Sequence, residues 1–324
     1  MRAIVCEAWG GPDTLALREI ADPVAGTGEV VVKIHAAGVN FPDVLIIQKK
    51  YQVQPALPFT PGAEIAGEIE AVGEGVAGFK VGDRVLALCS TGGFAEKIAL
   101  NAHLCVPIPA QVPYDVAAGF MLAFCTAHHA LIDRGGVASG DTVLVLGAAG
   151  GVGLASVEIA KARGATVIAA ASSDAKLVIC RERGADLTIN YTTEDLRAAI
   201  KTHTEGRGLD IIVDPVGGAF AEPAFRSIAW RGRYLVIGFA NGEIPSLPLN
   251  LPLLKGASIV GVFWGEFARR EPARQIAMMQ DLFEMLAERK IRPLISKTYR
   301  LEDARQALHD MAARQVTGKI VITP

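Results

Sequence analysis

The stretch LVLGAAGGVGLASVEIAKARG, residues 144–164, decides the fold of this chain. A strand-like apolar run ends at Gly147, and a helical pattern follows three glycines spaced by three, Gly147, Gly150 and Gly153. Glycines between a strand and a helix permit a tight turn, let backbone amides approach a pyrophosphate and let the helix pack close to the sheet. The spacing is one residue longer than G-x-G-x-x-G, but the context is the one that a dinucleotide site requires. A tight turn without a ligand is the alternative. The residues expected to bind pyrophosphate are Ala149, Gly150, Gly151, Val152 and Gly153.

Strands and helices alternate after this unit. Strand-like runs are expected at residues 142–147, 166–171, 187–190, 210–214, 234–239 and 257–263. Helical segments are expected at residues 152–163, 174–183, 194–203 and 219–229. This alternation is typical of an α/β fold with a Rossmann-type, doubly wound parallel sheet that is covered on both faces. Ligands bind at the carboxyl edge of such sheets, where the later strands end in Gly238, Phe239, Phe263 and Trp264.

The chain before about residue 120 has a different pattern. Short Val-rich runs at residues 29–36, 65–72 and 83–88 are separated by glycine and proline turns, which predicts a small β-rich barrel or sandwich. Residues 116–132 are expected to form a buried helix. The chain is expected to finish with helices at 272–290 and 301–313 and a strand at 318–323.

The strand at 166–171 ends in small hydroxyl residues and not in an acid. In a dinucleotide-binding unit, an Asp or Glu at this point binds the ribose 2′-hydroxyl and repels a 2′-phosphate. Here Ser172 and Ser173 follow the strand, and Lys176 can pair with a phosphate. We therefore expect NADPH as the cofactor, with Ser172 and Lys176 at its 2′-phosphate and Tyr191 stacking or capping near the adenosine. Alternatively, the serines cap the next helix and Lys176 is solvated; both readings can hold together.

Composition and charge argue against several classes of protein. The chain is 51% hydrophobic and 20% charged, which argues against disorder. Its net charge of −2 gives no general attraction to nucleic acid or to anionic membranes. The five cysteines show no Cys-x-x-Cys spacing and are expected to be reduced thiols of a cytoplasmic protein. No signal peptide and no membrane-spanning segment are expected.

Six motifs spread over the chain are similar in sequence, order and spacing to those of one family. They are HAAGVNFPD (35–43), LPFTPGAEIAGEIEAVGEGV (57–76), FKVGDRV (79–85), GGFAEK (92–97), GAAGGVG (147–153) and GKIVI (318–322). On these motifs the chain resembles the zinc-independent quinone oxidoreductase group of the medium-chain dehydrogenase/reductase superfamily. The resemblance implies a GroES-like, β-rich catalytic domain formed by residues 1–122 and 266–324, and a Rossmann domain formed by residues 123–265.

The chain departs from the zinc-dependent alcohol dehydrogenases of that superfamily at each ligand position. The resemblance places a Cys near Asn40, a His at Ala63 and a second Cys at Leu122, and the region of the structural zinc has only Cys89. A catalytic zinc needs three protein ligands. We therefore expect no metal.

Without a metal to polarise an alcohol or ketone, hydride transfer from a nicotinamide suits an acceptor that is already electrophilic. The resemblance implies an NADPH:quinone oxidoreductase that acts on a small quinone. A reductase of the C=C bond of enals, enones or enoyl thioesters is the alternative, with the same fold and cofactor. A third reading is an NADPH-binding protein with a structural or RNA-binding role, although the near-neutral charge makes nucleic acid an unfavourable partner.

The resemblance also assigns roles to single residues. Asn40 is expected to act at the catalytic site as a polar contact to the nicotinamide ribose or the substrate, or else to stabilise a turn. Tyr51 is expected to line the substrate pocket and donate a proton, or else to be a packed rim residue. Thr126 is expected near the nicotinamide, or else as a helix cap or core residue. Lys319 is a family cofactor contact, or else a solvated lysine.

Aromatic residues and an edge strand complete the predicted site and assembly. The expected pocket walls are Phe41, Tyr51, Phe263 and Trp264, with Phe263 also at the cofactor, although core packing explains such aromatics equally well. In the family, the edge strand near residues 255–265 pairs with its twin across a two-fold axis. A bare apolar edge strand is an aggregation hazard, so we expect a homodimer.

Overall fold

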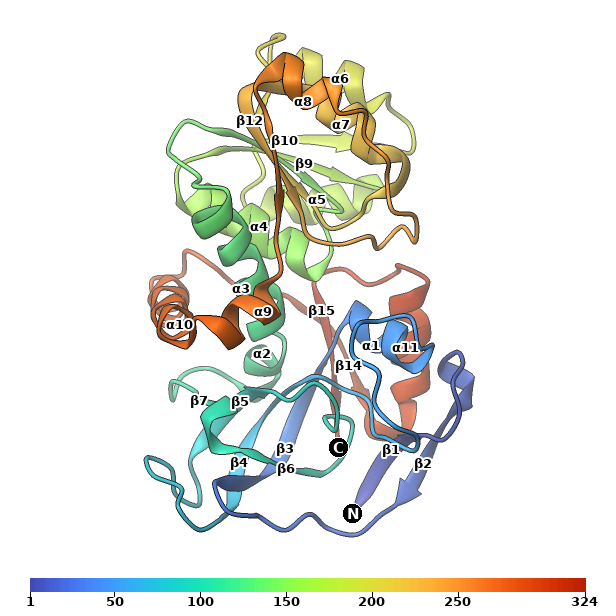
Figure 1. Cartoon of the computed structure of the whole chain (residues 1–324), viewed down its shortest axis with the longest axis vertical. Coiled ribbons are helices and arrows are strands. Elements are labelled where there is room, and N and C mark those ends of the chain that lie inside the picture. Colours follow the sequence, from blue (N-terminus) through green and yellow to red (C-terminus); the bar gives the residue numbers. More distant parts are fainter. The chain divides into compact units, whose positions relative to one another are not determined.

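The computed structural model describes all 324 residues, which form two compact units (Figure 1). One unit comprises Met1–Leu122 and Pro293–Pro324, and the other comprises Ala123–Arg292. The second unit thus extends past the predicted end at residue 265. It includes α9 (Trp264–Arg270) and α10 (Pro272–Ala287). The reason is packing inside this unit, since Asp281 of α10 lies 2.7 Å from the Nε2 of His128 at the end of α3 (Met121–His128).

The second unit contains a six-stranded sheet in the order β10-β9-β8-β11-β12-β13, with every pair parallel. Its strands are β8 (Thr142–Leu146), β9 (Thr166–Ala171), β10 (Leu187–Asn190), β11 (Leu209–Asp214), β12 (Ile228–Val236) and β13 (Ser258–Gly261). The chain runs outward from β8 to β10 and then crosses to β11, which makes the sheet doubly wound. Its switch point lies between the carboxyl ends of β8 and β11, where ligands bind in such folds. The predicted α/β class is confirmed.

Helices cover both faces of this sheet. They are α4 (Gly151–Ala162), α5 (Asp174–Glu182), α6 (Leu196–His203), α7 (Ala221–Arg226) and α8 (Asn250–Lys255). Alternate strand residues such as Leu144 and Ile168 pack with Leu196 of α6 and Phe225 of α7. The residues between them in the strands are also buried, and α4 packs on β8 and β9. Because successive side chains of a strand point to opposite faces, the sheet is buried on both sides.

Two sequence-based predictions in this region were wrong. The strand predicted at 234–239 begins at Ile228 and ends at Val236. Its polar middle resembles a turn in the sequence, but a bulge around Arg231, with φ of 61°, lets the strand continue through it. The single buried helix predicted at 116–132 consists of α2 (Tyr114–Ala118), α3 and a π-helical turn, His129–Arg134. The first break lies near Gly119, where a Cβ would come within 2.7 Å of the Ile295 side chain.

The first unit is built on a seven-stranded sheet in the order β14-β15-β3-β4-β5-β7, with β6 also paired to β3. Its strands are β3 (Glu29–Val39), β4 (Glu64–Val72), β5 (Arg84–Leu88), β6 (Lys97–Asn101), β7 (Cys105–Pro107), β14 (Ile295–Arg300) and β15 (Lys319–Thr323). Antiparallel pairing of β15 with the end of β3 brings the C-terminal segment into the N-terminal sheet. Two helices, α1 (Phe41–Ile47) and α11 (Ala304–Ala312), pack against each other in this unit. The predicted β-rich domain is confirmed.

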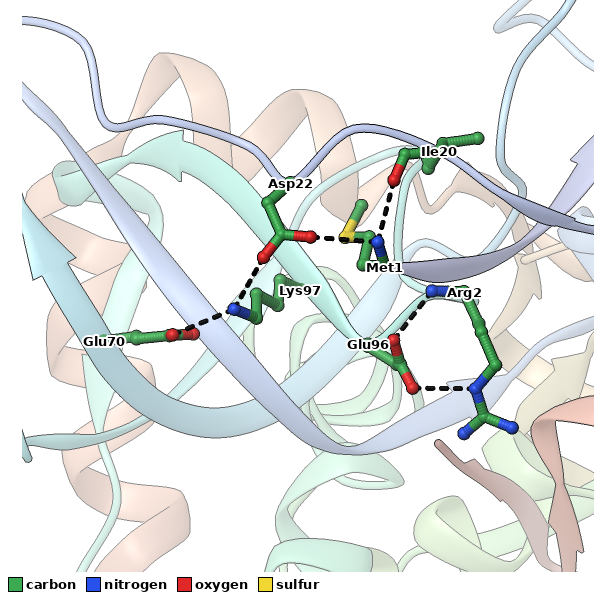
Figure 2. A network of polar contacts seen from close by, with 7 residues as sticks. All are labelled: Met1, Arg2, Ile20, Asp22, Glu70, Glu96 and Lys97. Carbon is green, nitrogen blue, oxygen red and sulfur yellow. Dashed lines mark hydrogen bonds and ion pairs between the residues drawn. The ribbon is translucent and has the colours of Figure 1, made fainter.

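A two-stranded sheet of β1 (Arg2–Cys6) and β2 (Leu15–Glu19) is tied to the same unit by ion pairs (Figure 2). The Met1 amino group lies 2.9 Å from Asp22, and the Lys97 ammonium bridges Asp22 and Glu70 at 2.8 and 2.9 Å. Arg2 donates its backbone N–H and its Nε to Glu96 at 2.7 and 2.8 Å. Each exposed ion pair of this kind contributes little to stability. Together they link the β1–β2 hairpin to the rest of the unit.

Two further expectations concern thiols and membrane spans. None of the five cysteines forms a disulfide bond. None of the helices combines the length and the apolar character that crossing a bilayer requires.

A buried carboxylate joins α4 to the end of the second unit. Glu158 is 4% exposed and accepts the Arg292 backbone N–H at 2.8 Å and an Arg183 Nη1–H at 3.3 Å. Burial is the main influence on it and raises its pKa from 4.5 to about 7, although these donors partly oppose the rise. The folded protein therefore retains a proton at Glu158 over a pH range in which the unfolded chain has lost it.

Glu158 is expected to make folding stability depend on pH. Between pH 4.5 and about 7, stability should fall with rising pH, because the folded state binds the extra proton. Glu158→Gln removes this titration and should reduce the loss over that range by up to about 3 kcal/mol. Urea unfolding at several pH values measures the difference. Glu222, whose side chain is 44% exposed and paired with Arg226, is the control site, and an equal effect of Glu222→Gln would contradict the assignment.

Candidate cofactor site and buried polar network

The glycine loop has the geometry of an anion-binding turn. After β8, Gly147 adopts a left-handed conformation with φ of 59°. A Cβ on Gly153 would lie 2.3 Å from the Gly147 carbonyl oxygen, so helix α4 approaches the loop as closely as only glycine permits. A Cβ on Gly150 would meet nothing nearer than 3.5 Å. Gly150 also precedes the helix with no side-chain cap, which leaves the first amides of a 12-residue helix available to an anion. Ala149 is part of this turn and is 3% exposed.

The residues predicted to recognise a 2′-phosphate lie together at the carboxyl end of β9. The Lys176 Nζ donates to the Ser172 Oγ at 3.3 Å. The Ser173 Oγ accepts the Lys176 backbone N–H and caps α5, so the capping alternative holds for Ser173 alone. Burial lowers the pKa of Lys176. Tyr191 is held beside this strand end by a 3.2 Å bond from its N–H to the Ala171 carbonyl.

The loops after β11 and β12 are organised by Asp214, a residue that sequence reasoning missed. Its Oδ1 accepts the backbone N–H groups of Val216 and Gly217 at 2.7 and 2.8 Å, and its Oδ2 accepts the Tyr234 hydroxyl. The Gly238 N–H approaches the Asp214 carbonyl oxygen at 3.4 Å. Phe239 follows and is 37% exposed. An Asp that ends a strand and precedes Pro-Val-Gly-Gly is the sequence signal that could have found this residue.

Two predicted pocket walls in the second unit have different surroundings. Phe263 precedes α9 and is 60% exposed, whereas Trp264 is 5% exposed. The Trp264 Nε1–H donates to the Gln275 Oε1 at 2.7 Å, as a buried indole requires. Trp264 therefore packs in the core, which is the alternative to a role as a pocket wall. Thr126 lies inside α3, half-buried and well past its first turn, so its helix-capping alternative is wrong.

In the first unit, a buried polar network surrounds Asn40. The Lys319 ammonium, 4% exposed, donates to the Val39 carbonyl oxygen at 3.1 Å, to the Glu64 Oε2 at 3.2 Å and to the Asn40 Oδ1. The Asn40 Nδ2 donates to the Glu64 Oε2 at 3.1 Å and to the Gly38 carbonyl oxygen at 3.3 Å. The second Glu64 oxygen accepts the Leu122 N–H at 2.9 Å. Both amide hydrogens of Asn40 and all three donors of Lys319 are thus used inside the protein.

Asp43 and Tyr51 lie next to this network. Asp43 is fully buried and accepts the Asn40 backbone N–H at 2.7 Å in a capping box that starts α1. Its Oδ1 has no hydrogen bond of normal geometry, although the Ala63 backbone N–H is near enough to favour its charge. Burial raises the pKa of Asp43 to about 7. Burial also raises the pKa of Tyr51, with a second contribution from the charge of Asp43, so the Tyr51 phenol stays protonated at neutral pH. Phe41 begins α1 and is half-buried.

The three positions at which the family resemblance would place zinc ligands contain no His or Cys. Asn40 is engaged in the network, Ala63 is 6% exposed, and Leu122 contributes its backbone N–H to Glu64. Nowhere do three or more His, Cys, Asp or Glu side chains group in a way that could hold a metal ion.

Comparison with known proteins gives the same picture of the two units. The chain matches the alcohol dehydrogenase GroES-like domain over residues 26–110 and the zinc-binding dehydrogenase family over residues 151–282. It is 38% identical to quinone oxidoreductase-like protein 2 homolog of Nematostella vectensis, over 99% of this chain and 88% of that protein. It is 33% identical to human quinone oxidoreductase, over 99% of this chain and 97% of that protein. The chain belongs to the quinone oxidoreductase family of medium-chain dehydrogenase/reductases.

Solved structures of this family superpose over the whole chain. The Escherichia coli quinone oxidoreductase, crystallised with NADPH, is 27% identical and covers 100% of both chains with a TM-score of 0.93. A probable oxidoreductase from Mycobacterium abscessus is 38% identical, with a TM-score of 0.90, over 100% of this chain and 99% of that one. The chain is therefore an oxidoreductase with a Rossmann-type unit and a GroES-like unit.

Removing the Lys319 ammonium from this oxidoreductase should destabilise the first unit strongly. Lys319→Met leaves the Glu64 carboxylate buried without its cation, and breaking a buried pair of this kind costs about 3–5 kcal/mol. Adding Glu64→Gln should recover part of that loss, because no unpaired charge then remains. Urea unfolding of the single and double variants measures both effects.

The control is Lys80→Met, which removes a lysine whose side chain is 83% exposed and paired with Asp83. It should leave the unfolding midpoint almost unchanged. A loss for Lys319→Met no larger than for Lys80→Met would contradict the importance of the network.

Proposed function

We propose that this chain is an NADPH-dependent quinone reductase that needs no metal. The observation that carries the cofactor assignment is the pairing of Ser172 with Lys176 at the end of β9, with a bond of 3.3 Å. An acidic side chain at this strand end would bind the 2′-hydroxyl of NADH. A hydroxyl and an ammonium favour the 2′-phosphate of NADPH instead. The NADPH complex of the E. coli relative supports the same cofactor.

The glycine loop fits the rest of this cofactor. The open space beside Gly150 and the uncapped start of α4 suit a pyrophosphate. Tyr191, Gly238, Phe239, Phe263 and Thr126 remain our proposed contacts to the adenosine and nicotinamide parts. Bound NADPH would supply the hydride.

In the first unit, the residues support an acceptor that is reduced without a Lewis acid. The zinc-ligand positions of related enzymes hold Asn40, Ala63 and Leu122, which lack the donor set for zinc. Lys319 and the Asn40 side chain are bound inside the protein, so we assign both a positioning role for α1 and Phe41. Tyr51, protonated because its pKa is raised, is the proposed hydrogen-bond donor to the acceptor oxygen.

Acceptor and cofactor can be tested in one assay. Purified, chelator-treated protein should oxidise NADPH rapidly with 1,4-naphthoquinone and slowly with a trans-2-alkenal, and it should use NADH poorly. Lys176→Met should lower kcat/KM for NADPH about tenfold, the value of one charge-assisted hydrogen bond, with little change for NADH.

Each other outcome has a distinct meaning. Faster turnover of the alkenal would move the assignment to reduction of C=C bonds and leave the cofactor assignment intact. Equal use of NADH and NADPH would refute the role of Ser172 and Lys176. Activity that disappears with the chelator and returns with Zn²⁺ would refute metal independence.

We also propose that the enzyme is a homodimer through the edge of its parallel sheet. β13 is the last strand in the sheet order, and Ile259 on it is 43% exposed. Beside it, Trp230 on β12 is 70% exposed and Leu253 on α8 is 78% exposed. α8 packs on β12, and the Trp230 ring lies over Gly256 at the end of α8. An apolar patch next to an unpaired strand edge suits a second copy of the same strand.

Ile259→Asp is therefore expected to convert the dimer to a monomer, since it places a charge on the pairing edge. Sedimentation velocity of the wild-type protein and the variant measures this change. The control is Ile276→Asp on α10, whose residue is 61% exposed and lies outside the patch. A monomeric wild-type protein, or an Ile259→Asp variant that remains dimeric, would contradict the proposal.

A further inference from the structure

Two carboxylates stand close to the proposed 2′-phosphate site, and both are restrained by one residue. Asp174 lies two positions after Ser172, at the first turn of α5, and Glu194 follows β10. The Asn190 Nδ2 donates to the Asp174 Oδ1 at 2.8 Å, and the Asn190 backbone N–H donates to the Glu194 Oε1 at 2.7 Å. Negative charge near a phosphate opposes its binding, and the repulsion grows as a carboxylate moves closer to the phosphate.

Asn190 itself is firmly fixed at the end of β10. It is 6% exposed. Its Oδ1 accepts the Thr192 backbone N–H at 3.2 Å and lies 2.6 Å from the Thr192 Oγ1, which is also 3.3 Å from the Ser172 carbonyl oxygen. The ends of β9 and β10 are therefore joined through Asn190 and Thr192. The same two strand ends carry Ser172 and Tyr191.

We infer that Asn190 is a positioning residue that determines the preference for NADPH over NADH. Its amide holds the Asp174 carboxylate toward β10 and so leaves Ser172 and Lys176 to face the 2′-phosphate. Released from Asn190, the Asp174 carboxylate can turn toward Ser172, where an acid repels the phosphate of NADPH and accepts the 2′-hydroxyl of NADH. This inference rests on the proposed NADPH site.

The substitution Asn190→Ala releases only the Asp174 carboxylate. The backbone N–H that holds Glu194 remains in this variant. The ratio of kcat/KM for NADPH to that for NADH should fall about tenfold, the value of a hydrogen bond to a charged group. The change should appear in KM for NADPH, while kcat with saturating NADPH stays close to that of the wild-type protein. Without any acceptor present, the dissociation constant for NADPH, measured by quenching of protein fluorescence, should rise relative to that for NADH.

A double variant tests the mechanism directly. Asn190→Ala combined with Asp174→Asn should regain most of the wild-type ratio, because the released side chain no longer carries charge. A merely structural role of Asn190 predicts no such recovery. Asn190→Ser replaces Asn190→Ala if the latter does not fold.

The matched control is Asp195→Asn, which removes one negative charge from the start of the neighbouring helix α6, where Asp195 caps the Ala198 N–H at 2.7 Å. It should leave the cofactor ratio unchanged. The inference is overturned if Asn190→Ala keeps the wild-type ratio or if Asp174→Asn does not restore it. A wild-type protein that shows no preference for NADPH would instead refute the proposed cofactor, and this inference with it.

Discussion

One buried ammonium, that of Lys319, links three segments of the first unit. A charge in a dry interior is tolerated only where acceptors surround it, and the acceptors here come from the end of β3, from Asn40 and from β4. The ammonium therefore joins β15 to two strands from the opposite end of the chain. It also fixes the Asn40 side chain, whose backbone N–H starts the capping box of α1. The position of Phe41 follows from the same constraint.

In the second unit, polar residues at the carboxyl edge of the sheet also have hydrogen-bond partners inside the protein. Polar residues that end the strands are satisfied by neighbouring backbone: Asp214 holds the loop after β11, and Asn190 holds the loop after β10. The start of α4 differs, because no side chain caps it. An uncapped helix start that directly follows the glycine turn, beside polar groups that have internal partners, offers a place for an anion. The site thus depends as much on the satisfied groups as on the glycines.

The sequence predicts local features well and long-range ones poorly. β9 and β10 were predicted at their observed limits, because each is an apolar run bounded by turn residues. The start of β12 was missed, because a bulge at Arg231 hides the strand period. The roles of Asn40 and Lys319 could not be predicted from spacing, since Lys319 and Glu64 are 255 residues apart. Likewise, Ser172 and Lys176 are visible in the sequence, but the restraint of Asp174 by Asn190 depends on the pairing of two strands.

The buried network also bears on the kind of acceptor that the proposed reaction can use. A catalytic zinc polarises an oxygen through an open coordination position. The Lys319 ammonium has no such position, because its three donors already have acceptors inside the protein. In the proposed reaction, polarisation of the acceptor would depend on neutral donors such as the Tyr51 hydroxyl, whose raised pKa keeps its proton in place. A neutral hydrogen bond stabilises developing negative charge less than a metal ion does. The proposed acceptor would therefore supply its own electrophilicity, as a quinone does and a simple ketone does not.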